Sequence, residues 1–184
     1  MGVALTPAKG KRPTASAWAL EAHDIRPDGT RTERLRASGA IATAATHPAH
    51  GQVKMAKRHT WQVAMQVAAG KALCYAEQLR RKGRRVTISL PSATTARDLQ
   101  PTRPGETRPK TSHRDIASNN SRKLQQLGAQ VAINVDAAIT PQRLQREAGA
   151  AARSGDLHTQ VSVPGRAIHA IPFWDELRTW DPGD

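Results

Sequence analysis

The sequence predicts an α/β or α+β protein with a small three- to four-stranded mixed sheet packed by helices and a long basic N-terminal arm. Three observations predict this fold. Apolar residues recur at helical spacing over 60–82, and they alternate with polar residues over 86–90. Two further alternating segments, 131–135 and 157–163, enclose a second helical pattern. Residues 1–58 show no sustained period.

The first 58 residues mix Ala, Thr, Pro, Gly and Arg. Leu, Ile, Val and Phe number only 30 of the 184 residues, so the supply of core-forming side chains is small. We therefore expect a largely irregular arm that becomes ordered on phosphate or on a neighbouring subunit, with a solvated tail as the alternative. Trp18 is the one large apolar anchor in its first part, and we expect it to contact a partner.

A small α/β domain is expected over 59–165, and a long helix opens it. Thr60 is suited to cap this helix, because a Thr hydroxyl accepts hydrogen bonds from the first free backbone N–H groups. Three cations, Arg80, Arg81 and Lys82, stand at its end, where they complement the helix dipole. Gly83 then fits the left-handed position that follows many helices.

Three strands follow from alternation. Pro91 ends the first strand, Asp136 the second and Pro164 the third. The helix between the last two strands takes Thr140 as its cap, and Gly155 closes it.

A weak internal repeat relates 79–100 to 124–145 at a constant offset of 45 residues. Eight of the 22 aligned positions are identical, among them Gly83 with Gly128 and Thr95 with Thr140. Each copy has the pattern helix end, Gly, strand, short loop, Thr cap, helix. The sequence predicts two similar α-β-α units, with either duplication or shared structural punctuation as the cause.

Two segments depart from this pattern. Residues 101–122 are rich in Pro, Arg and Lys, and a long basic loop inside a compact domain is usually functional or disordered. Residues 166–184 are acidic and aromatic. There we expect a short helix that either closes the core or docks on another subunit.

The charge is distributed unevenly along the chain. The formal net charge is +13, of which residues 1–128 hold +15 and residues 129–184 hold −2. Such a field attracts phosphate polymers and gives salt-dependent, sequence-independent binding. The chain has one Tyr and one Phe, too few for an aromatic platform that stacks bases. The sequence therefore favours contact with the nucleic-acid backbone.

The candidate contacts fall into two groups. The expected phosphate-binding residues are cations of the arm, of the helix end and of the 101–122 region: Lys9, Lys11, Arg12, Arg80, Arg81, Lys82, Arg84, Arg85, Arg103, Arg108, Lys110, Arg114, Arg122 and Lys123. The expected partner-binding residues are large apolar side chains: Trp18, Phe173, Trp174, Leu177 and Trp180.

The sequence contains only weak matches to metal-binding and catalytic motifs. His47 and His50 flank a Pro-Ala pair without a third metal ligand nearby in the sequence. Ser112 and Asp115 are better explained as the cap and first turn of a helix than as parts of a catalytic triad. We expect no cofactor and no metal.

The cysteine content and the apolar runs of the sequence bear on disulfide formation and on where the protein is found. Cys74 is the sole cysteine, so the chain has no internal disulfide. No apolar run reaches the roughly 18 residues of a membrane helix, and the N-terminus lacks an apolar signal core. We expect no membrane partner, and a place in the cytoplasm or within an assembled particle.

Together these features favour a basic, non-enzymatic protein that binds DNA or RNA without sequence preference. One alternative is a subunit of a virus particle or other large assembly, with homo-oligomeric or heterologous contacts made by the arm and the C-terminal helix. A second is a nuclease or toxin acting on RNA or DNA, because carboxylates after strands, such as Asp136, are common Mg²⁺ ligands.

Overall fold

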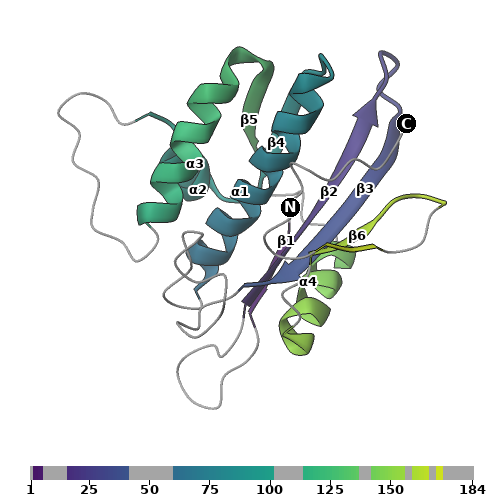
Figure 1. Ribbon diagram of the computed structural model, residues 1–184, viewed down its shortest axis with the longest axis vertical. Helices are drawn as coiled ribbons and strands as arrows, with labels where there is room; N and C mark the ends of the chain where they lie inside the picture. Colours follow the sequence, from purple (N-terminus) through teal and green to yellow (C-terminus); the bar gives the residue numbers. More distant parts are fainter. Residues whose placement is uncertain are drawn as a thin grey trace.

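The computed structural model describes residues 2–5, 16–41, 60–101, 114–136, 142–155, 159–165 and 169–171 (Figure 1). Helices combine with both antiparallel and parallel strand pairing, so the predicted α/β class is confirmed. The strands are divided differently from the expectation. Instead of one small mixed sheet, the described residues form a five-stranded antiparallel sheet and a separate two-stranded parallel sheet.

The antiparallel sheet has the order β1-β2-β3-β6-β7. Its strands are β1 (Gly2–Leu5), β2 (Ser16–Ile25), β3 (Arg31–Ala40), β6 (Thr159–Ser162) and β7 (His169–Ile171). The expectation of a largely irregular 1–58 segment is therefore wrong for 16–41, where two ten-residue strands form a hairpin. Residues 6–15 and 42–59 lie outside the described part of the chain.

The hairpin forms because its side chains alternate between two buried faces. Trp18 and Leu20 belong to the main core, whereas Ala17 and Ala19 pack with Leu144 in a second cluster. Two covered faces leave little polar alternation in the sequence, so the pattern does not resemble a half-buried strand. Trp18 is 1% exposed, and the expectation that it contacts a partner is corrected: the ring fills the core.

Helix α1 (Trp61–Arg81) lies at the centre of the molecule (Figure 1). As expected, Thr60 caps it, and the Thr60 hydroxyl accepts a hydrogen bond of 3.2 Å from the Val63 amide. The helix packs on β1 and β2 of the antiparallel sheet and on α3 and β4 at its other side. This central position explains why apolar residues such as Met65 and Leu73, on different sides of the helix, are all buried.

The parallel sheet joins β4 (Val86–Leu90) to β5 (Val131–Val135). Every pair in its register is offset by 45 residues, from Val86 with Val131 to Leu90 with Val135. The 45-residue offset of the internal repeat is therefore also the register in which β4 pairs with β5. In both units a helix ends at a left-handed glycine before the strand, with φ of +74° at Gly83 and +68° at Gly128.

The second halves of the two units differ. Ser92, and not Thr95, caps α2 (Ala93–Leu99), because the Ser92 hydroxyl accepts from the Thr95 amide at 3.2 Å. Helix α3 (Arg114–Leu127) leads through a short 3-10 turn into β5. Helix α4 (Gln142–Ser154) packs on the antiparallel sheet, on the face opposite α1, and not on the parallel sheet (Figure 1).

Candidate nucleic-acid interface

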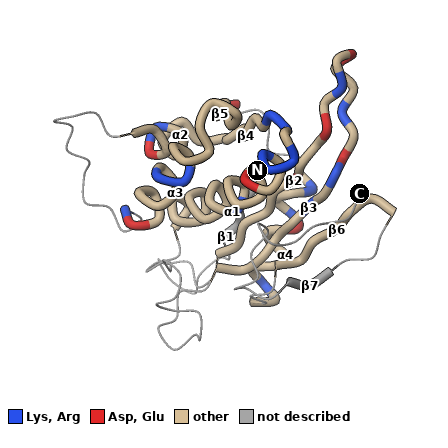
Figure 2. The backbone as a smooth tube through the Cα atoms, turned by 45° about the horizontal axis from the view of Figure 1, so that its top comes forward, with Lys and Arg blue, Asp and Glu red and all other residues tan. Residues whose placement is uncertain are grey.

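A basic corner, defined as residues 80–85, follows the end of α1. It holds five cations in six residues, and all six residues are exposed. Its backbone is fixed by a glycine turn in which the Gly83 amide donates to the Arg80 carbonyl at 2.8 Å and the Arg84 amide to the Leu79 carbonyl at 3.1 Å. The turn reverses the chain, so Arg84 and Arg85 stand beside the last helical cations. Figure 2 shows Lys and Arg gathered at this end of α1.

The basic corner is joined to the β2–β3 hairpin by ion pairs. Arg84 contacts one carboxylate oxygen of Asp24 at 2.7 Å, and Arg34 contacts the other at 3.3 Å. Arg34 is an extra residue in β3, because the register shifts between Ala22 and His23. Its guanidinium donates at 3.1 Å to the hydroxyl of Tyr75 on α1.

Burial and the contacts of Arg34 together shift the pKa values of Tyr75 and Arg34. Burial raises the pKa of Tyr75 and is only partly opposed by the hydrogen bond and charge of Arg34. Burial disfavours the Arg34 charge, yet the contacts with Tyr75 and Asp24 outweigh it and raise the pKa of Arg34. Tyr75 therefore remains a neutral phenol that holds the base of the hairpin against α1.

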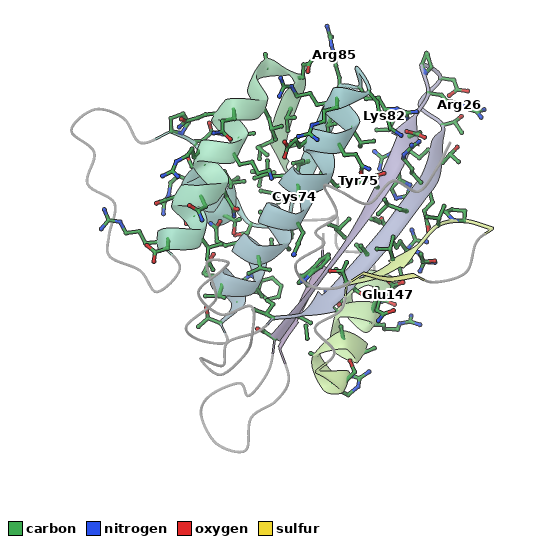
Figure 3. The ribbon with its side chains drawn as sticks, in the orientation of Figure 1. Arg26, Cys74, Tyr75, Lys82, Arg85 and Glu147 are labelled. Atoms are coloured by element: carbon green, nitrogen blue, oxygen red, sulfur yellow. The ribbon has the colours of Figure 1, made fainter. Side chains whose placement is uncertain are left out.

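The cations of the basic corner differ in how they are held. Arg80 donates to the Gln130 side chain at 3.1 Å, which links the basic corner to the turn before β5. Arg81 pairs with Glu77 at 2.8 Å but remains 68% exposed. Lys82 and Arg85 stand at the same end of the molecule as Arg26 of the hairpin turn (Figure 3). A phosphate chain crossing this end would meet charges from two elements.

Lys123, an expected phosphate-binding residue, makes contacts within the fold. Its ammonium lies 3.2 Å from the Cys74 sulfur and 3.1 Å from a Glu77 carboxylate oxygen. Burial works against its charge, but these two contacts outweigh burial and raise the pKa of Lys123. The Lys123 side chain joins α3 to α1 through its ion pair with Glu77.

The other expected binding residues do not lie in the basic corner. Arg114 and Arg122 are exposed on α3, on a different element from the basic corner. The remaining candidates lie outside the described residues and stay predictions: Lys9, Lys11, Arg12, Arg103, Arg108, Lys110, Phe173, Trp174, Leu177 and Trp180.

Two arginines where α4 meets the antiparallel sheet are neutralised within the fold. Arg143 of α4 pairs with Glu21 and, at 3.0 Å, with Glu33 of the antiparallel sheet. Arg36 of β3 pairs with Glu33 at 2.7 Å and with Glu147. The hydrogen bonds that both arginines donate to these carboxylates raise the pKa of Arg36 and of Arg143. These ion pairs stabilise the packing of α4. In the described part of the chain, exposed cations are therefore more closely spaced in the basic corner than around α4.

Sequence reasoning missed Arg26 and Arg31 at the end of the hairpin. Both are exposed, and Arg31 pairs across the strands with Ile25. The available signal was Pro27-Asp28-Gly29, because Asp-Gly is typical of a hairpin turn.

Comparisons with protein-family models, with curated proteins and with solved structures found no match for this chain. In the described ranges, no three His, Cys, Asp or Glu side chains are grouped as metal ligands. None of the helices in those ranges has the length and apolarity needed to cross a membrane.

Proposed function

We propose that this protein is a non-enzymatic nucleic-acid-binding protein that contacts the phosphate backbone through the basic corner. One observation carries the proposal: five cations in six residues are held exposed by a hydrogen-bonded glycine turn. A fixed arrangement loses less conformational entropy on binding than the same charges on a flexible segment. The C-terminal end of a helix also carries partial negative charge, so these cations are well tolerated there before any ligand binds.

Contact with the phosphate backbone explains why the basic corner itself needs no base-reading groups. Arg and Lys contacts to phosphates fix position and orientation but carry no sequence information. The described residues of this surface contribute guanidinium and ammonium groups and few aromatic side chains. The proposal therefore predicts binding to nucleic acids of many sequences, with affinity set by ionic strength.

The test compares two triple variants with the same change in net charge. The corner variant is Arg81→Ala, Lys82→Ala and Arg85→Ala. The control variant is Arg97→Ala, Arg146→Ala and Arg153→Ala, three exposed arginines on α2 and α4. Affinity for a labelled duplex and a labelled single strand is measured for both variants at the same salt concentration.

We expect the corner variant to lose roughly tenfold or more in affinity and the control variant to lose much less. Equal losses would mean that only total charge matters, and the basic corner would then not be the interface. Circular dichroism and thermal unfolding show whether each variant keeps its fold.

A further inference from the structure

The β2–β3 hairpin extends beyond the core as a two-stranded ribbon. Leu35 is fully buried and Ala22, its cross-strand partner, is partly buried, whereas every residue from Ile25 to Thr32 is exposed. Three residues of β2 follow Ala22 before the turn, and at about 3.3 Å per residue they extend about 10 Å. Figure 2 shows the end of the ribbon standing apart from the end of α1.

The turn at the end of the ribbon is well defined. The Gly29 amide donates to the Arg26 carbonyl at 2.9 Å, and the Arg26 amide donates to the Thr30 carbonyl at 3.0 Å. Gly29 has φ of +83°, which closes the turn in a conformation suited to glycine. Asp28 accepts a hydrogen bond of 2.8 Å from the Thr30 amide, so its carboxylate is engaged in the turn.

The acidic residues at the base of the ribbon are paired with cations. Asp24 contacts Arg34 and Arg84, and Glu33 contacts Arg36 and Arg143. The end of the ribbon presents two arginines, Arg26 and Arg31. An exposed apolar side chain lies beside them, because Ile25 is the cross-strand partner of Arg31, precedes Arg26 in the chain and is 64% exposed.

The ribbon has the dimensions of a groove-binding element. The major groove of B-form DNA is about 12 Å wide and about 8.5 Å deep and admits a two-stranded β-ribbon. An extension of about 10 Å therefore reaches the base edges. The major groove of A-form RNA is too narrow and deep for such entry.

We propose that the ligand is double-stranded DNA and that the β2–β3 ribbon enters its major groove while the basic corner contacts the adjacent phosphates. This inference rests on the function proposed above and specifies its ligand. Arg26 and Arg31 contact phosphates or guanine edges at the groove wall, and Ile25 contacts the apolar thymine methyl groups. Asp24 and Arg84 fix the ribbon relative to the basic corner, so both surfaces meet one duplex.

Chemical protection distinguishes the two grooves. Dimethyl sulfate methylates guanine N7 in the major groove and adenine N3 in the minor groove. With the full chain bound to a mixed-sequence DNA duplex, we expect protection at guanine N7 and little change at adenine N3. Arg26→Ala with Arg31→Ala should remove that protection while the residual binding through the basic corner persists.

Ile25→Ser isolates the apolar contact, because it changes no charge. We expect roughly a fivefold to tenfold loss of affinity for duplex DNA and no loss for a duplex RNA of matched sequence. The matched control is Val135→Ser, which alters a second exposed apolar residue, 46% accessible, at the end of β5. Unchanged thermal midpoints confirm that both variants are folded.

Two outcomes would overturn the inference in different ways. Equal affinity for DNA and RNA duplexes without guanine N7 protection would refute groove entry, yet the function proposed above would stand if the corner variant still lost binding. Absence of binding to any nucleic acid at low salt would refute both proposals.

Discussion

Arg84 and Asp24, 60 residues apart in sequence, are joined by an ion pair of 2.7 Å that ties the end of α1 to the second strand. Their side chains are 42% and 46% exposed, so solvent screens the pair. Its contribution to stability is therefore small, and its role is to fix the position of one basic surface relative to another.

Asp24→Asn should separate these two effects. We expect the free energy of unfolding to fall by less than about 1 kcal/mol, because the lost contacts are partly exposed. Guanine N7 protection of a DNA duplex at saturating protein should weaken, because Asp24 no longer fixes the ribbon relative to the basic corner. Urea unfolding and dimethyl sulfate protection measure the two changes, and full protection by Asp24→Asn would contradict the positioning role of the pair.

Gly70 allows α1 and α3 to approach closely. A Cβ at this position would lie 2.8 Å from the Asn120 amide oxygen. Asn120 has little freedom to move, because its amide nitrogen donates to the Gln66 carbonyl at 2.7 Å and to the Gln66 side chain at 3.0 Å. We predict that Gly70→Ala destabilises the protein by about 1–3 kcal/mol, despite the higher helix propensity of Ala.

Gly149 in α4 is the matched control for that variant. There the nearest atom to a new Cβ is the flexible end of Arg153, at 3.4 Å. Gly149→Ala should stabilise the protein by about 0.5–1 kcal/mol through helix propensity alone. The same sign for both variants in chemical denaturation would contradict the described packing of α1 on α3.

Trp18 tests whether the N-terminal hairpin belongs to the core. Its ring is 1% exposed, close to Gly39 and beneath the Lys71 ammonium, which lies 5.8 Å from the ring centroid. We predict that Trp18→Ala lowers the free energy of unfolding by about 3–5 kcal/mol. Trp61→Ala should cost far less, because Trp61 is 42% exposed. Equal small losses would instead suit a solvated arm.

The lowered pKa of Glu77 makes the free energy of unfolding fall at acid pH. Burial works to raise the pKa of Glu77, but hydrogen bonds and charge from Lys123 and Arg81 outweigh it and lower the pKa below its ordinary value of 4.5. The stabilisation is complete above pH 4.5 and is lost as pH falls through the lower folded pKa. Glu77→Gln should therefore flatten the acid limb of the unfolding free energy against pH. An unchanged limb would mean that the Lys123 contact contributes nothing.

The sequence was informative where local signals and tertiary structure agree. Thr60, Gly83 and the alternating strands were readable because a cap, a left-handed glycine and a half-buried strand are set by near neighbours. The offset of 45 residues also predicted similar units, and the structure converts it into the register of β4 on β5.

The features that the sequence did not predict depend on packing between residues far apart in the chain. Strands β2 and β3 are covered by α1 on one face and α4 on the other, which removes the polar alternation expected of a half-buried strand. The inward turn of Lys123 depends on Cys74 and Glu77, 49 and 46 residues earlier in the chain. No local pattern distinguishes such a lysine from a phosphate ligand.

The salt dependence of binding reports how many phosphates the basic corner contacts. The equilibrium constant for a DNA duplex is measured from low to high salt for the unmodified protein, the corner variant and the control variant. Each phosphate contact contributes about 0.9 to the slope of log K against log salt, so the corner variant should lose about 2.7 from that slope. The control should keep the full slope. An unchanged slope in the corner variant would contradict the claim that residues 80–85 contact the phosphate backbone.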